Sequence, residues 1–203
     1  MELFIKSTLL LFVLLNPFLM SVYLVELIKG MNSREFARQL IRAGIISYVV
    51  FLLFAWAGET IFEDVLQVRF LSFMIFGGIT FLIIGIRMII GIGAPVESLR
   101  PHNKEVSGAI AMPFIVGPGT ITVSVLTGSR LDFAAAAGAI ALGLGAAIAA
   151  ILVMKKVYDI VRNRNEVYLA RYMDIAGRVT ALLAGTFAIE LILKGLERWL
   201  ALQ

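Results

Sequence analysis

Long apolar stretches separated by short polar segments run along the whole chain. An α-helix needs about 20 predominantly apolar residues to cross a bilayer. The stretches of this length and character are residues 3–27, 38–57, 70–92, 108–126, 133–154 and 175–193. The first of them continues past position 15 instead of ending at a small-residue cleavage site, so we expect it to be retained as a span. The pattern predicts an all-α polytopic membrane protein with six transmembrane helices.

The polar segments between these stretches predict how the helices are connected. Residues 29–35 form a polar turn in which Ser33 is expected to cap the second helix. Residues 58–64 are expected to lie at the membrane interface, and residues 93–107 to form a polar loop that contains prolines. A basic loop at residues 155–172 is expected before the last helix.

The composition supports the membrane class and argues against several others. Hydrophobic residues make up 60% of the chain and charged residues 16%, with a mean hydropathy of +0.94. A soluble domain has about 25% charged residues, so the lipid bilayer is the expected surrounding partner. The net charge of +4 comes from Lys and Arg that flank the spans, and we expect no nucleic-acid partner. The chain has no cysteine and no cluster of metal-ligating residues, so we expect no metal and no cofactor.

The distribution of positive charge predicts the orientation. Most Lys and Arg residues lie in the connections after the first, third and fifth spans. Cytoplasmic loops carry the excess of Lys and Arg in membrane proteins. We therefore expect a multi-pass protein with both termini on the extracytoplasmic side.

Two of the apolar stretches are interrupted by helix-breaking residues. Asn16-Pro17 interrupts the first stretch, and Gly117-Pro118-Gly119 interrupts the fourth. Proline lacks a backbone donor and clashes with the preceding helical turn, whereas Asn or Gly followed by Pro is typical of a helix start. We predict that helices 1 and 4 are discontinuous. A pair of proline kinks that only shape helix packing is the alternative interpretation.

Several residues in the first half of the chain match residues in the second half at a constant sequence spacing. The two interruptions are separated by nearly the same spacing. Gly77 aligns with Gly177 and Gly85 with Gly185, while Asn16-Pro17 aligns with Gly117-Pro118. This predicts one transmembrane domain, residues 1–203, with a repeat at about 1–92, a cytoplasmic loop at about 93–107 and a second repeat at about 108–203. Three spans in each repeat would orient the halves oppositely. Inverted repeats with discontinuous helices characterise many secondary transporters.

The two predicted helix starts suggest a substrate site. The first amides of a helix and its dipole favour an anionic group, and carbonyls at the ends of the preceding half-helices favour a cation, so a small zwitterion would suit both. Gly117 is expected either to let the backbone approach a ligand or to adopt a positive φ, and Thr120 to add a hydroxyl. The candidate substrate-binding residues are Asn16, Pro17, Phe18, Gly117, Pro118, Gly119 and Thr120.

Several motifs resemble the MarC family of membrane proteins. They are Leu15-Asn16-Pro17-Phe18, Phe76-Gly77-Gly78-Ile79 and the segment from Ala111-Met112-Pro113 to Gly117-Pro118-Gly119-Thr120-Ile121-Thr122. The resemblance covers essentially all six spans. It implies a location in a prokaryotic cell (inner) membrane and, through the SnatA branch, transport of small neutral amino acids such as glycine and alanine. Two departures stand out: Leu19, Met20 and Val22 follow Asn-Pro where the family often has small polar residues and a further proline, and Glu190 stands where glutamine is more usual.

Two charged residues in the last span are candidates for gating or coupling. Arg178 could instead snorkel or serve packing, and Glu190 has Lys194 four residues on, the favourable order for a helical ion pair. An intramembrane enzyme is not expected, because the chain lacks a Ser/His/Asp set, His-Glu-x-x-His and an intramembrane carboxylate pair. The chain also lacks a phosphate loop for ATP. We predict a secondary transporter of small neutral amino acids such as glycine and alanine. Export is one possible direction of transport, and coupling to protons or to sodium is left open. A non-transporting membrane assembly or regulatory factor remains the alternative, although it would not explain two matched helix breaks.

Overall fold

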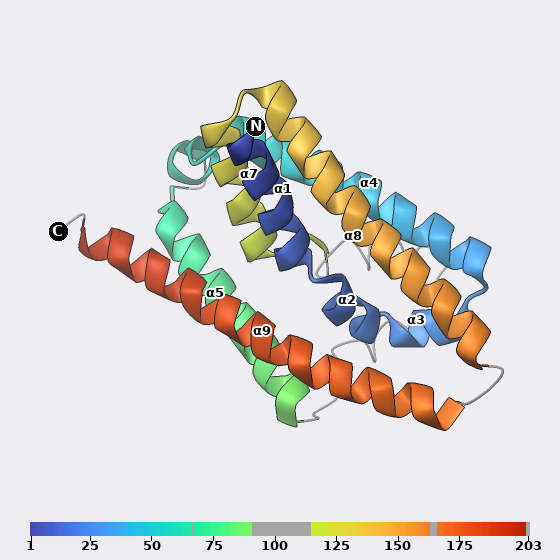
Figure 1. The fold of residues 1–203 in the computed structure, drawn as a ribbon. Helices are drawn as coiled ribbons and strands as arrows, with labels where there is room; N and C mark the ends of the chain where they lie inside the picture. Colours follow the sequence, from blue (N-terminus) through green and yellow to red (C-terminus); the bar gives the residue numbers. More distant parts are fainter. Residues whose placement is uncertain (66, 91–114, 163–165, 202–203) are drawn as a thin grey trace.

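The described part of the chain is helical throughout. The computed structural model describes residues 1–65, 67–90, 115–162 and 166–201, and no strand occurs within these ranges (Figure 1). The helices are α1 (Glu2–Leu15), α2 (Pro17–Tyr23), α3 (Val25–Gly30), α4 (Ser33–Ala57), the π-helix η1 (Ile61–Val65), α5 (Phe70–Ile90), α7 (Pro118–Arg130), α8 (Phe133–Arg162) and α9 (Glu166–Leu200). The predicted all-α class is thus confirmed. The expected loop at 93–107, the boundary between the two predicted repeats and the first part of the fourth span lie outside the described residues.

Three described helices are long and apolar enough to cross a bilayer. They are Ser33–Ala57, Phe70–Arg87 and Phe133–Val161. By contrast, α1 has 14 residues and α7 has 13. Neither α1 nor α7 reaches the roughly 20 residues that one crossing needs, so each would have to share a crossing with another segment.

Two local expectations from the sequence are wrong. Asn32, and not Ser33, caps α4, because the Asn32 Oδ1 atom accepts a hydrogen bond of 2.9 Å from the amide of Glu35. The expected loop at 155–172 is largely helical, since α8 continues to Arg162 and α9 begins at Glu166. Lys and Arg are good helix formers, so the helix continues after the apolar pattern has ended.

The side chains are arranged as a bilayer requires. On α4, the large apolar residues Ile41, Ile45, Val49 and Leu53 are exposed at every fourth position. Ser47 on the same helix is fully buried, and its hydroxyl donates to the carbonyl of Ala43. In water such a row would be an exposed hydrophobic patch, whereas in a bilayer it contacts the apolar lipid chains.

The helices form two antiparallel pairs with shorter helices between them. Figure 1 shows α4 and α8 side by side along one side, α5 and α9 along the other, and α1, α2 and α7 in the space between. Contacts between α1 and α7 bring the two segments that adjoin Pro17 and Pro118 together. The centre of the molecule is therefore built from the interrupted parts of the chain.

Helices α4 and α8 have the same burial pattern. Position by position, residues 36–55 of α4 and 136–155 of α8 share buried, intermediate and exposed classes, except at Arg38 and Gly138. The helices also begin alike, with side-chain caps from Asn32 and from Asp132, whose Oδ2 accepts from the amide of Ala135 at 3.1 Å. The two helices therefore occupy matching environments in the two halves of the chain.

Helices α5 and α9 cross at small residues. A methyl group added at Gly85 would lie 3.2 Å from the carbonyl oxygen of Ala181 and 3.4 Å from the nitrogen of Gly185. Further along α5, a methyl group at Gly78 would meet the Ala188 carbonyl oxygen at 2.7 Å. Small residues at these positions let the two backbones approach closely, as is common in membrane helix packing.

This packing predicts that Gly78→Ala will destabilise the protein. The added methyl group would meet backbone atoms of α9 that cannot move without shifting the helix, at a cost of roughly 1–3 kcal/mol. The matched control is Gly145→Ala on α8, where nothing lies within 4 Å of an added Cβ. Thermal unfolding of the purified protein in detergent should show a lower Tm for Gly78→Ala alone, and equal Tm values would contradict the crossing described here.

Candidate substrate site at the helix breaks

The first break lies at Asn16. Helix α1 ends at Leu15, and Asn16 adopts the left-handed conformation with φ 41° and ψ 78°. Asn tolerates this region better than most residues, and its amide still donates to Phe12 O at 3.2 Å. Pro17 then begins α2, whose first backbone bond runs from Met20 N to Asn16 O at 3.0 Å. The proline therefore starts a new helix instead of continuing α1.

The second predicted break lies at Gly117, where the described residues show the start of α7 and a different backbone geometry. Gly117 is the N-cap of α7 with φ −117° and ψ 167°, and Pro118 is the first helical residue. The first backbone bond of α7 runs from Ile121 N to Gly117 O at 2.9 Å, which matches the bond at the first break. The positive φ considered for Gly117 is wrong, because this residue begins a helix from extended backbone. The positive φ occurs at Asn16, which has to end one helix before another begins.

Thr120 closes the second break with its hydroxyl group. Its Oγ1 accepts a hydrogen bond from the Gly117 amide at 2.9 Å and lies 2.9 Å from the carbonyl oxygens of Ile115 and Gly117, to which it can donate. The residue is buried. In this conformation the hydroxyl is therefore used by the backbone.

A small cavity lies beside the first break. It is lined by Val13, Leu14, Asn16, Phe81, Phe187, Ala188 and Leu191. Its volume of about 10 Å³ is room for about one water molecule. In this conformation the cavity is therefore too small for alanine.

The second break reaches the walls of the same cavity. A methyl group added at Gly119 would lie 3.4 Å from Leu191 Cδ1, 3.6 Å from Phe81 Cε2 and 3.8 Å from Leu14 Cδ2. A methyl group at Gly117 would lie 3.2 Å from Phe81 Cε2. The structure thus brings Asn16 from one break and two glycines from the other to a common group of apolar side chains.

The remaining candidates from the two breaks do not line the cavity. Pro118 packs on α5, where a methyl group at Gly77 would overlap the proline ring. Pro17 is buried, and the Phe18 side chain is half exposed. The amides of Gly119 and Thr120 precede the first bonded amide of α7, so they have no acceptor within the helix. These amides are the polar groups that α7 can offer to a ligand.

Sequence reasoning missed most of the residues that enclose the cavity. Phe81 on α5 and Phe187 and Leu191 on α9 supply much of the wall. Each is an apolar residue in an apolar helix, and no local pattern distinguishes it from a residue that faces lipid. Only the packing of α5 and α9 against the breaks assigns them to the site.

The two charged candidates on α9 are not among the residues that line this cavity. Arg178 and Glu190 are both exposed. The expected ion pair of Glu190 is confirmed, with Lys194 Nζ 3.0 Å from Glu190 Oε1 and both side chains more than half exposed. Glu190 therefore takes part in a surface pair in this conformation.

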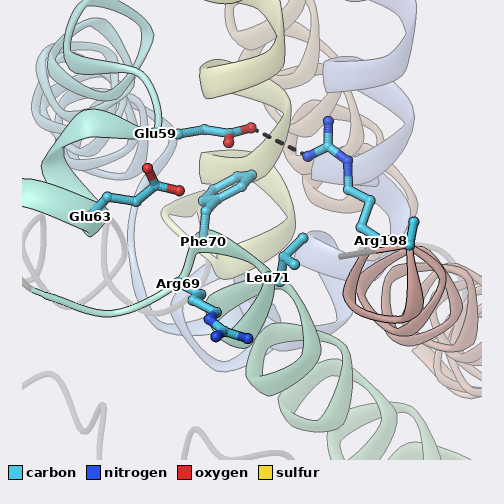
Figure 2. A pocket seen from close by; sticks show the side chains of 7 residues that line it. Glu59, Glu63, Arg69, Phe70, Leu71 and Arg198 are labelled. Atoms are coloured by element: carbon cyan, nitrogen blue, oxygen red, sulfur yellow. Dashed lines mark hydrogen bonds and ion pairs between the residues drawn. The ribbon is translucent and has the colours of Figure 1, made fainter. Parts of the chain in front are cut away.

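A larger pocket opens at the end of the bundle near the carboxyl terminus. Its volume is about 420 Å³, and its apolar wall is formed by Phe70 and Leu71. Figure 2 shows Glu59 and Arg198 reaching toward one another, with Arg198 Nη1 3.3 Å from Glu59 Oε1. Glu63 and Arg69 also line the pocket (Figure 2), so the four charged side chains sum to zero.

Together, outward apolar faces, buried hydroxyls and membrane-length helices define an integral membrane protein. The chain belongs to the MarC family of integral membrane proteins, which matches residues 1–200. A UPF0056 membrane protein of Pyrococcus horikoshii is 29% identical over 124 residues, which cover 60% of this chain and 60% of that protein. No solved structure matches the chain. The family predicted from the motifs is thus confirmed.

The capping role of Thr120 can be tested with two variants. Thr120→Val should lower the free energy of unfolding by roughly 1–3 kcal/mol, because the buried amide of Gly117 loses its acceptor. Thr120→Ser keeps the hydroxyl and should lose much less. Thr122→Val is the control, since the hydroxyl of Thr122 only donates to the Pro118 carbonyl. Chemical denaturation in detergent measures the difference, and equal losses at positions 120 and 122 would refute the capping role.

The exposed pair on α9 predicts a small effect for Glu190→Gln. An exposed i,i+4 ion pair contributes about 0.3–0.5 kcal/mol, so stability should change by no more than this. Lys194→Gln should have the same effect and the double variant no additional one. If Glu190→Gln folds normally yet loses transport that Lys194→Gln retains, Glu190 has a role in coupling beyond the surface pair.

Proposed function

We propose that the protein is a secondary transporter of small neutral amino acids such as glycine and alanine. The observation that carries this proposal is the meeting of two helix breaks at one cavity. Asn16 lines the cavity, and Gly119 lies against three of its other lining residues. Helix breaks at membrane depth occur where protein or a cavity covers the freed backbone groups, and transporters bind substrates at such sites.

The proposed architecture is six spans in two inverted three-helix repeats, with helices 1 and 4 discontinuous. The matching burial of α4 and α8 supports it. So does the approach of Gly85 to Gly185, because residues that correspond under a twofold axis can touch only near that axis. The helix contacts fit too. In the proposed repeat α2 corresponds to α7 and α5 to α9, so the contact of α2 with α9 is the counterpart of the contact of α7 with α5. The repeats would comprise residues 1–92 and 108–203, joined by a cytoplasmic loop.

The site chemistry suits a small zwitterion. The amides of Gly119 and Thr120, which have no acceptor within α7, would receive the carboxylate, as helix N-termini favour anions. The amide oxygen of Asn16 would accept from the ammonium group. The apolar walls formed by Phe81, Phe187 and Leu191 would leave space for a hydrogen or a methyl side chain and exclude larger ones.

Binding would require the site to open, because the present cavity holds about one water molecule. In this proposal the structure would correspond to a closed state between two open ones. In the proposed orientation both termini are extracytoplasmic and the protein lies in a prokaryotic cell membrane. The pocket lined by Glu59 and Arg198 would then be on the outer side, where its balanced charges would admit a neutral zwitterion.

Uptake of labelled alanine and glycine into proteoliposomes tests the function. The wild-type protein should accumulate both amino acids, and imposing a proton or sodium gradient should reveal the coupling ion. Gly119→Val should abolish uptake and binding, because its side chain would occupy the space between Leu14 and Leu191. Gly119→Ala is the matched control, since its methyl group would make only ordinary contacts. Asn16→Ala should weaken binding about tenfold through one lost hydrogen bond to a charged group.

The outcome separates the two function classes. Calorimetry on each folded variant gives the affinity independently of transport. If the wild-type protein neither binds nor transports glycine or alanine, the assembly or regulatory alternative gains support. If Gly119→Val binds glycine and alanine as the wild type does, the cavity described here is not the substrate site.

A further inference from the structure

Lys155 is a buried cation near the end of α8. Its side chain is only 4% exposed. The ammonium group donates to the carbonyl oxygen of Ile28 in α3 at 2.7 Å and to Asp159 Oδ1 at 2.6 Å. The hydroxyl of Ser33, at the start of α4, donates to the other carboxylate oxygen of Asp159. This network joins α8 to α3 and to the first turn of α4.

The matching position in the other half of the chain is built differently. Lys155 corresponds to Ala55 in the shared burial pattern of α8 and α4. At the same offset, Ile28 corresponds to Gly128 of α7, and a methyl group at Gly128 would overlap the carbonyl group of Ala55. The two corresponding helix pairs are therefore joined differently: α3 and α8 by an ammonium group, and α7 and α4 by direct backbone packing.

The two junctions respond differently to water. Burying the ammonium group of Lys155 costs much of what its attraction to the partly exposed Asp159 returns, and the ammonium group recovers its hydration when the junction parts. Close backbone packing gains only dispersion contacts, which are lost when the helices separate and are not replaced by strong hydration. The charged junction is therefore the one that can open toward water at small net cost.

We propose that Lys155 is a positioning residue that holds α3 against α8 in the closed state and releases it, while the junction of Ala55 and Gly128 stays packed. Helix α3 follows directly on α2, which begins at Pro17 beside the substrate cavity. Release of α3 opens the cavity toward this end of the bundle, which is the cytoplasmic end in the proposed orientation. The assignment of this movement to the transport cycle rests on the proposed function.

The absence of cysteine from the chain allows a direct test. Leu27→Cys and Thr127→Cys place one reporter beside each junction, at matching and buried positions. The rate of alkylation by a water-soluble maleimide, measured on purified protein without substrate, reports how often each junction opens. The background variants are Lys155→Met, which keeps the apolar stem without the charge, and the control Lys156→Met, whose lysine is exposed.

Lys155→Met should raise the alkylation rate of Leu27→Cys about tenfold, the effect of losing a hydrogen bond to a charged group, and should leave Thr127→Cys unchanged. Lys156→Met should change neither rate. Asp159→Asn, which keeps the shape of the side chain, should give the same asymmetry to a smaller extent and serves if Lys155→Met does not fold. Equal acceleration at both reporters would mean that Lys155 only stabilises the fold, and no acceleration at either would mean that it does not hold the junction. Both results would overturn the proposal.

The labelling experiment is independent of substrate. An asymmetric labelling result combined with no amino acid uptake by the wild-type protein would leave the releasable junction in place and reject the proposed transport function. Amino acid uptake by the wild-type protein combined with symmetric labelling would support the transport function and reject the releasable junction. The two proposals can therefore fail separately.

Discussion

Backbone amides and carbonyls in a bilayer have no water to bond with, so each interruption of a helix has to be covered by the rest of the protein. This constraint explains why α1, α2 and α7 lie between the two antiparallel pairs (Figure 1). At one break, Asn16 turns the chain through a left-handed conformation. At the other, the hydroxyl of Thr120 satisfies the backbone around Gly117. The long helices enclose these breaks.

Helices α4 and α8, from the two halves of the chain, are alike in packing more than in sequence. Helices α4 and α8 share their burial pattern across twenty positions with one difference, although their residues seldom agree. Burial is imposed by the neighbours of a helix, and many apolar residues can fill the same environment at similar volume. The places where the halves differ chemically, such as Ala55 and Lys155, therefore stand out against a common framework and indicate where they have separate tasks.

The sequence predicted features whose causes are local. Proline acts on its own helical turn wherever it occurs, so the starts of α2 and α7 could be placed at Pro17 and Pro118 before any packing was known. Span length and hydropathy predicted α4, α5 and α8 because a helix in lipid must satisfy its own backbone. The ion pair of Glu190 with Lys194 was predictable for the same reason, since both residues lie on one helix face.

The tertiary structure decided which side chains meet. Lys155 was expected in a solvated loop because lysine is usually exposed, yet the approach of α3 supplies a carbonyl acceptor that allows its burial. Phe81 and Leu191 enclose the central cavity only because α5 and α9 pack against the breaks from distant parts of the chain. The sequence by itself determined the membrane class, the family and the positions of the breaks, which depend on composition and on the local chemistry of proline. Cavity walls and junctions depend on contacts between residues far apart in the chain, and no local pattern encodes those contacts.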